Sequence, residues 1–315
     1  MGIKNINQLS FLTWNLYLGA DITPLMKFSP NHFSLTVTEV FRQALATNFP
    51  DRVKAITHQI ALLKPDIIGL QEAVKWQFLS PNFKSVTIDF LQLLLLELKN
   101  RGVFYKIATI NKNITVDYPD SYGNVVKLTD RDVILILDNP KLTIINKKQA
   151  KFNNNLIISV PGYSLEIFRG WSFVDVSYYG AIFSVMNTHL EPYSVIQLQQ
   201  AKEILIGPAK TNNPFVILGD LNSNAVIFAP TYRLFIDSGF QDIWRKVGKG
   251  LGFTCCQDPD LLNATSKLES RIDFILYKNG WNPVEAKLVG DKLQDRTSTG
   301  LWPSDHAGVF GKLAM

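Results

Sequence analysis

The chain has 315 residues, of which 46% are hydrophobic and 19% charged, the proportions of a globular protein with a sizeable core. Its 32 lysines and arginines outnumber the 27 acidic residues, giving a net charge of +5 and a pI of about 9.0. This modest excess is compatible with nucleic acid or an anionic membrane as a partner and selects neither. Residues 1–8 lack the apolar segment of a secretory signal, and no apolar run is long enough to span a bilayer. We therefore expect a cytoplasmic protein, or one exported without a cleaved signal peptide.

The two cysteines, Cys255 and Cys256, are adjacent in the sequence. Neighbouring cysteines form a disulfide only in a strained geometry, and the chain has no others for a disulfide framework or a zinc site. We therefore expect two buried thiols, with a redox role as the alternative.

Strand-like and helix-like segments alternate along the chain. The predicted strands are residues 9–15, 66–72, 104–110, 132–138, 156–160, 173–177, 181–187, 215–219, 271–277 and 307–313. The predicted helices are residues 51–64, 86–99, 194–206 and 231–237, and the turn at 178–180 joins two strands as a hairpin. Such a mixture predicts an α/β fold of packed sheets with helices outside. Loops at 18–48 and 111–130 are long enough to be functional rims. We find no linker and expect one domain, residues 1–315, acting as a monomer.

Polar residues follow the apolar run of several predicted strands. The clearest case is residues 216–219, a buried strand that stops at Asp220 and Asn222. The other strand ends carry Asn15, Glu72 and His189. Because the strand ends of α/β sheets gather in one crevice, we expect these side chains to share a site. Two further motifs belong to the same set, Arg271-Ile272-Asp273 and Ser304-Asp305-His306, and Asp132 begins a middle strand that faces the same crevice.

Each of these residues also has a structural interpretation. Asp220, Asn222 and Asn15 could form polar turns with local hydrogen bonds to the backbone. Glu72 could be a solvated strand end or a helix cap, and His189 a satisfied core histidine. Asp273 could simply pair with Arg271. Only their joint occurrence favours a catalytic site.

The chain resembles the endonuclease/exonuclease/phosphatase superfamily, which includes apurinic endonucleases, pancreatic-type deoxyribonucleases, inositol-polyphosphate phosphatases and neutral sphingomyelinases. Its motifs occur here in order: Asn15, Gln71-Glu72, Thr188-His189-Leu190, Gly219-Asp220-Leu221-Asn222, Arg271-Ile272-Asp273 and Ser304-Asp305-His306. The resemblance implies a four-layer α/β sandwich, two packed mixed β-sheets flanked by helices. His189 is similar to the deoxyribonuclease and sphingomyelinase branches. Trp171 and residues 252–256 resemble a bacterial subgroup of unassigned substrate.

The resemblance implies Mg²⁺-dependent hydrolysis of a phosphodiester, with Mn²⁺ as a substitute metal. It assigns the metal to Asn15, Glu72 and Asp305, oxygen ligands of the kind that Mg²⁺ prefers. It assigns catalytic roles to five further residues. Asp220 would orient or deprotonate the water, Asn222 and His189 would bind the phosphate, His306 would stabilise charge on it, and Asp273 would orient His306.

The substrate is left open between nucleic acid and a phospholipid head group. Lys141, Lys147, Lys148 and Lys151 form a basic cluster that suits nucleic acid or a solvated surface. The loop at 18–33, with Leu25, Met26, Phe28 and Phe33, could instead contact lipid. From another functional class, a phosphate-ester binding module that has lost its activity is the alternative.

Overall fold

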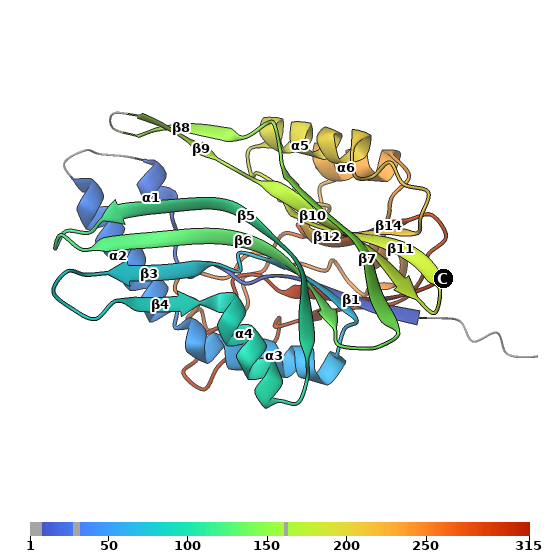
Figure 1. Cartoon of the computed structure of the whole chain (residues 1–315), viewed down its shortest axis with the longest axis horizontal. Helices are drawn as coiled ribbons and strands as arrows, with labels where there is room; N and C mark the ends of the chain where they lie inside the picture. Colours follow the sequence, from blue (N-terminus) through green and yellow to red (C-terminus); the bar gives the residue numbers. More distant parts are fainter. Residues whose placement is uncertain (1–7, 28–31, 161–162) are drawn as a thin grey trace, which may run out of the picture.

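The computed structural model of the protein describes residues 8–27, 32–160 and 163–315 (Figure 1). The strands are β1 (Gln8–Asn15), β2 (Ile67–Gln71), β3 (Lys75–Leu79), β4 (Val86–Asp89), β5 (Tyr105–Pro119), β6 (Val125–Leu137), β7 (Leu142–Lys151), β8 (Leu156–Val160), β9 (Tyr163–Ile167), β10 (Gly170–Tyr178), β11 (Ala181–His189), β12 (Phe215–Asp220), β13 (Gln241–Asp242), β14 (Asp273–Lys278), β15 (Asn282–Val289) and β16 (Gly308–Ala314). The helices are α1 (Thr23–Met26), α2 (Phe33–Ala46), α3 (Phe49–Leu63), α4 (Phe90–Asn100), α5 (Ser194–Ile206), α6 (Pro230–Asp237), α7 (Ile243–Val247) and the 3₁₀ helix η2 (Leu293–Asp295).

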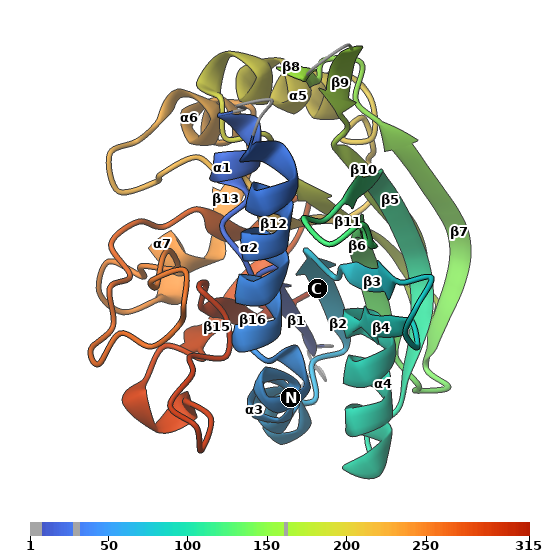
Figure 2. The same cartoon turned by 90° about the vertical axis from the view of Figure 1, so that its left-hand side faces the viewer.

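Two large sheets organise these elements. The eight-stranded sheet has the order β15-β16-β1-β2-β6-β3-β4, with β5 paired to β6. The six-stranded sheet has the order β13-β14-β12-β11-β10-β7, and β8 and β9 form a separate two-stranded sheet. Figures 1 and 2 show α3 and α4 on one side of the two large sheets and α5 and α6 on the opposite side.

Alternating side chains of the central strands explain this layering, because successive residues of a strand face opposite sides of its sheet. In β1, Phe11 packs in the core between the two sheets, whereas Leu12 packs against α2, α3 and α4. In β12, Leu218 faces the other sheet and Ile217 faces α5 and α6. Both faces of the central strands are thus buried, and the predicted four-layer sandwich with two mixed sheets is confirmed.

Several predicted elements need correction. The predicted helix at 86–99 begins with the strand β4, and the Asp89 side chain caps α4 by accepting a hydrogen bond from the Gln92 backbone N–H. The predicted loop at 18–48 contains α1 and α2. Threonine, valine and phenylalanine are weak helix formers, which hid the helical spacing of the buried positions in α2. The predicted loop at 111–130 is mostly the β5–β6 hairpin.

Strand register brings the predicted site residues to one end of the sheets. The parallel pair β1 and β2 places Asn15 beside Gln71, which precedes Glu72. The parallel pair β11 and β12 places His189 beside Asp220, and β14 places Asp273 on the other side of Asp220. Because the two sheets pack face to face, both sets of strand ends open onto the same crevice.

Among the described residues, no helix is both long enough and apolar enough to cross a membrane. Phe28, part of the loop considered for lipid contact, lies outside the described residues.

Candidate active site

The eight residues predicted from the sequence converge on one cavity of about 570 Å³. Seven of them line it: Asn15, Glu72, His189, Asp220, Asn222, Asp305 and His306. Asp273 lies directly behind His306 and contacts its ring. The cavity size is that of a site for a small molecule or a segment of a larger one.

Asp220 occupies the centre of this group. Its Oδ1 accepts a hydrogen bond from the Asn222 backbone N–H at 2.8 Å, and its Oδ2 accepts one from Asn15 Nδ2 at 3.1 Å. The first bond is a local polar turn, with Asn222 at a φ of +50°, so the chain does not stay extended between the two residues. The turn and the site interpretations therefore hold together.

Gly219 is required where the neighbouring strands β11 and β12 pack together. Its φ is not positive, and a Cβ atom at this position would lie 2.2 Å from the Thr188 carbonyl oxygen of β11. The missing side chain lets β11 and β12 approach closely, which places His189 beside Asp220.

His306 is held by an acid. Its Nδ1 lies 2.8 Å from Asp273 Oδ2, so Nδ1–H donates a hydrogen bond to the Asp273 carboxylate. The other ring nitrogen, Nε2, faces the cavity. Nε2 lies 3.8 Å from Asp220 Oδ2 and 3.9 Å from Asp305 Oδ1. Burial opposes the charged ring, but the negative charges of Asp273, Asp305 and Asp220 outweigh it and raise the pKa of His306 well above its usual value. Arg271, the structural alternative as partner of Asp273, pairs instead with Asp242.

His189 is held by an arginine, Arg169. Arg169 Nη1 lies 2.9 Å from His189 Nδ1, and since a guanidinium can only donate, Nδ1 must be the acceptor. The neutral ring then carries its proton on Nε2, which lies 3.5 Å from Asp220 Oδ2. Burial, followed by the positive charges of Arg169 and His306, keeps the pKa of His189 well below its usual value. Asn222 Nδ2 lies 3.1 Å from Nε2 and donates to the Leu190 carbonyl.

Glu72 and Asp305 form the acidic side of the cavity with Asn15. Glu72 follows the end of β2 in a left-handed conformation, and its oxygens accept bonds from Leu18 N at 2.7 Å and Asn15 Nδ2 at 3.3 Å. Burial, then the charge of Asp130, raises the pKa of Glu72. Burial also raises the pKa of Asp305 to about 6, with the charge of Glu72 acting in the same direction.

The charge balance of the cavity fits a divalent cation. Among the described lining residues, two positive groups, Arg169 and the protonated ring of His306, face six acids: Asp21, Glu72, Asp130, Glu191, Asp220 and Asp305. Crowded, buried carboxylates are unfavourable unless a cation compensates them. The carboxylate oxygens of Glu72 and Asp305 are of the donor type that Mg²⁺ and Mn²⁺ bind, whereas the Asn15 amide oxygen accepts the Tyr17 backbone N–H at 3.0 Å.

A buried arginine, Arg52, connects two segments that lie near opposite ends of the sequence. Arg52 of α3 donates to the carbonyls of Leu16 and Tyr17, which follow Asn15, and to that of Pro303 at 2.9 Å, just before Asp305. Ser304 adds a 2.7 Å bond to the Asn15 carbonyl. Nothing in the sequence marks Arg52, because its partners are backbone groups far away along the chain.

The sequence patterns also did not mark Arg169, the charged residue directly before β10. Arg169 lies 3.8 Å from Asp130 and 3.7 Å from Glu191, and all three residues line the cavity. Asp132, predicted to face the crevice, instead lies fully buried, accepts a bond from Asn113 and does not line the cavity. Asp130 shares its strand face and reaches the cavity because it lies nearer the strand end.

Residues 252–256, to which the sequence gave no task, run between the Asp273 and His306 strands. The Thr254 hydroxyl accepts the backbone N–H of Asp273 at 3.2 Å, and the Thr254 carbonyl accepts that of Ala307 at 2.8 Å. The expectation of two buried thiols is wrong, because Cys255 is buried but Cys256 is exposed. Both residues line the cavity.

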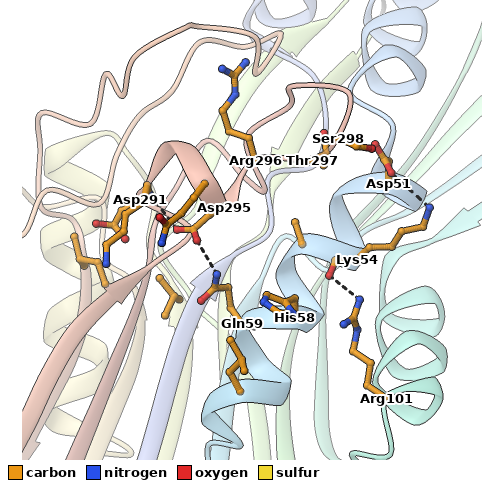
Figure 3. A pocket seen from close by; sticks show the side chains of 16 residues that line it. Asp51, Lys54, His58, Gln59, Arg101, Asp291, Asp295, Arg296, Thr297 and Ser298 are labelled. Carbon is orange, nitrogen blue, oxygen red and sulfur yellow. Dashed lines mark hydrogen bonds and ion pairs between the residues drawn. The ribbon is translucent and has the colours of Figure 1, made fainter.

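A second hollow lies between α3 and the segment around η2 (Figure 3). It contains none of the eight predicted residues. Its charged side chains are largely satisfied locally, for example Lys54 with Asp51 and Asp295 with Gln59. The residues predicted from the sequence therefore lie at the first cavity.

Comparison with known proteins gives matches over nearly the whole chain. Residues 12–306 match the model of the endonuclease/exonuclease/phosphatase family. The chain is 22% identical, over 98% of its length, to tyrosyl-DNA phosphodiesterase 2 of Rattus norvegicus and of Mus musculus. It spans about two thirds of the length of these relatives, 67% and 66%.

Solved structures of low sequence identity share the fold. A family member from Bacteroides thetaiotaomicron is 18% identical, with a TM-score of 0.64 and 99% of both chains covered. A mannosyl-6-phosphatase of the same species is 20% identical, with a TM-score of 0.60, 98% of this chain and 100% of that chain covered. A D. rerio tyrosyl-DNA phosphodiesterase 2 in complex with a single-stranded DNA product is 17% identical, with a TM-score of 0.56 and the same coverage. The chain therefore belongs to the endonuclease/exonuclease/phosphatase family of divalent-metal-dependent phosphoesterases.

Proposed function

We propose that the protein is a Mg²⁺-dependent phosphodiesterase that hydrolyses its substrate by in-line attack of water. The observation that carries this proposal is the position of Asp220 between two histidine Nε2 atoms, 3.5 Å from that of His189 and 3.8 Å from that of His306. A carboxylate flanked by two hydrogen-bond donors at the bottom of a cavity can hold a water molecule against a bound phosphate.

Asp220 accepts the proton of the attacking water. Burial, and then the negative charge of Asp273, raises the pKa of Asp220 to about 7. A general base is most effective when its pKa lies near the working pH, because it is then both deprotonated and basic enough. The backbone N–H of Asn222 and the Asn15 amide fix the orientation of this carboxylate.

The two histidines bind the phosphoryl oxygens in different charge states. His306, held protonated by Asp273, donates from Nε2 and carries a positive charge, so it stabilises the charge that builds up as the bond to the leaving group breaks. His189 donates from Nε2 as a neutral ring, and the Asn222 amide lies beside it. Together they hold the phosphate on both sides of Asp220.

Glu72, with Asn15 and Asp305 beside it, would hold the metal ion. When bound there, Mg²⁺ would supply positive charge to the phosphoryl oxygen and the departing oxyanion. Mn²⁺ accepts the same oxygen ligands and is proposed to substitute.

The test is hydrolysis of bis(p-nitrophenyl) phosphate with Mg²⁺ or Mn²⁺ present. Glu72→Ala should reduce kcat by at least about 10³-fold, because the main charged ligand of the metal is lost. Glu39→Ala, which removes a glutamate of α2 whose side chain is 58% exposed, is the matched control and should retain wild-type activity.

The alternative from another class, a binding module without activity, makes the opposite prediction. Wild type, Glu72→Ala and Glu39→Ala would then be equally inert with both metals. The proposal covers a phosphodiester of nucleic acid or of a phospholipid head group, and one catalytic domain, residues 1–315, working as a monomer. Residues from both sheets complete the site, which supports a single catalytic unit.

A further inference from the structure

One half of the active-site cavity is apolar. Beyond the polar floor, the lining is formed largely by aliphatic side chains, among them Leu25, Met26, Ile114, Val116, Ile158 and Leu165. None of these six is fully buried, so the protein itself leaves their apolar surface partly uncovered. We call them the aliphatic wall. Because the wall and the polar floor belong to the same cavity, one molecule can contact both.

Strand geometry shows that this wall is built by the fold. Ile114 and Val116 are two residues apart on β5 and so share one face of that strand. On the β8–β9 hairpin, Ile158 and Leu165 are cross-strand partners. Figure 1 shows this hairpin and α1, which carries Leu25 and Met26, at the same end of the molecule. Three separate parts of the chain therefore contribute apolar residues to one wall.

The charges around the cavity do not suit a polyanion. Arg169 is the only lysine or arginine among the described lining residues, and it is already engaged with His189, Asp130 and Glu191. Nucleic-acid sites usually track several phosphates with basic side chains. The lysine cluster of the sequence lies elsewhere: Lys147, Lys148 and Lys151 are exposed on β7, the edge strand of the six-stranded sheet, and line no part of the cavity.

We propose that the substrate is an amphiphilic phosphodiester, with its phosphate on the polar floor and an aliphatic chain of one ester group against the aliphatic wall. This inference rests on the proposed phosphodiesterase function and names its substrate class. A single phosphate needs only the two histidines and a metal ion, and the chain needs an apolar surface that continues from them. The cavity offers both together.

The experiment uses p-nitrophenyl methyl, butyl and octyl phosphates with Mg²⁺, below the concentrations at which the longer esters form micelles. Each methylene that leaves water gains about 0.8 kcal/mol, or about fourfold in kcat/KM. Three buried methylenes should therefore raise kcat/KM about 50-fold from the methyl to the butyl ester. Calorimetric titration of the same esters into metal-free protein gives a second readout that does not depend on turnover.

Two neighbouring isoleucines provide a matched pair of variants. Ile158 lines the cavity, whereas Ile157 points to the other face of β8 and is 65% exposed. Ile158→Asn should reduce the octyl-to-methyl ratio of kcat/KM at least tenfold, and Ile157→Asn should leave it unchanged. Leu165→Asn, the cross-strand partner position, replaces Ile158→Asn if circular dichroism shows that the latter is unfolded.

The outcomes separate the inference from the function on which it rests. Equal kcat/KM for the three esters, or equal ratios in the two isoleucine variants, would overturn the amphiphilic substrate and leave the phosphodiesterase intact. If no ester is hydrolysed but affinity rises with chain length, the catalytic proposal fails and the aliphatic binding site stands. If a single-stranded oligonucleotide is hydrolysed with higher kcat/KM than the octyl ester, the substrate is nucleic acid.

Discussion

The two histidines of the candidate active site have the same side chain and opposite partners. His306, just before β16, has the carboxylate of Asp273 against its Nδ1, whereas His189, at the end of β11, has the guanidinium of Arg169 there. The acid raises the pKa of His306 above its usual value, and burial together with the arginine lowers that of His189. One ring is therefore a cation and the other a neutral donor.

This difference shows that the partner at the far nitrogen decides what a histidine can do. Both rings direct Nε2 toward Asp220, at 3.8 Å and 3.5 Å, so their geometry toward a bound phosphate is similar. In the proposed mechanism, only the cationic ring adds a full charge for the transition state, while the neutral ring binds the phosphate as an uncharged donor. The comparison can be tested by replacing each histidine, by replacing Arg169, and by changing the pH.

The largest expected effect follows replacement of the two rings. His306→Gln should lower kcat about 10³-fold on bis(p-nitrophenyl) phosphate, because an amide cannot carry the positive charge. His189→Gln should lower it only about tenfold, since an amide N–H replaces a neutral ring N–H. Equal losses in the two variants would show that the rings do the same task. Circular dichroism of both variants is the control for folding.

The next effect concerns stability. Arg169→Met should lower the free energy of unfolding by about 3 kcal/mol, because it leaves Asp130 and Glu191 in a buried site without their cation. Arg42→Met removes an arginine whose side chain is 56% exposed and paired with Glu39, and should cost less than about 0.5 kcal/mol. Urea unfolding of the two variants measures the difference. A similar loss for both would mean that the acids beside Arg169 do not need it.

The smallest perturbation is a change of pH, followed by NMR on metal-free protein. His306 should remain protonated at pH 7, and His189 should remain neutral at pH 6. The unfolded value of a histidine pKa is about 6.5. Stability from His306 is therefore fully present below about pH 6.5 and lost as pH rises through its higher folded pKa. The contribution of His189 has the opposite sign, because its folded pKa is lower, and stability falls as pH drops below about 6.5.

Asp273→Asn is the control for this titration. The uncharged amide should lower the pKa of His306 and leave the His189 signal in place. If the His306 signal does not shift, the cause assigned to its charge is wrong.

Local sequence patterns predicted much of the framework. The apolar runs of β1, β2, β11 and β12 are continuous because both faces of these central strands are buried, and such runs are visible in a sequence. The edge strands β7 and β15, which are partly exposed and carry lysines, lack such runs and were missed. Their mixed composition protects sheet edges and conceals the strand.

The candidate site could be predicted in its membership and only partly in its contacts. Polar residues that end buried strands, such as Asp220 and His189, stand out against their apolar neighbours. Arg52 and Arg169 do not, because their partners lie far away in the sequence and include backbone carbonyls. The order of motifs along a sequence does not predict such long-range contacts.

The sequence by itself determined the family and the four-layer sandwich, and it selected eight polar residues that the fold brings together, because each depends on local patterns of burial and on motif order. Only the tertiary structure decided which charged side chain lies against Nδ1 of each histidine. It also decided which aliphatic residues of α1, β5 and β8–β9 line the same cavity as the polar residues. Charge state and cavity shape depend on distances between segments far apart in the chain, and those distances exist only after folding.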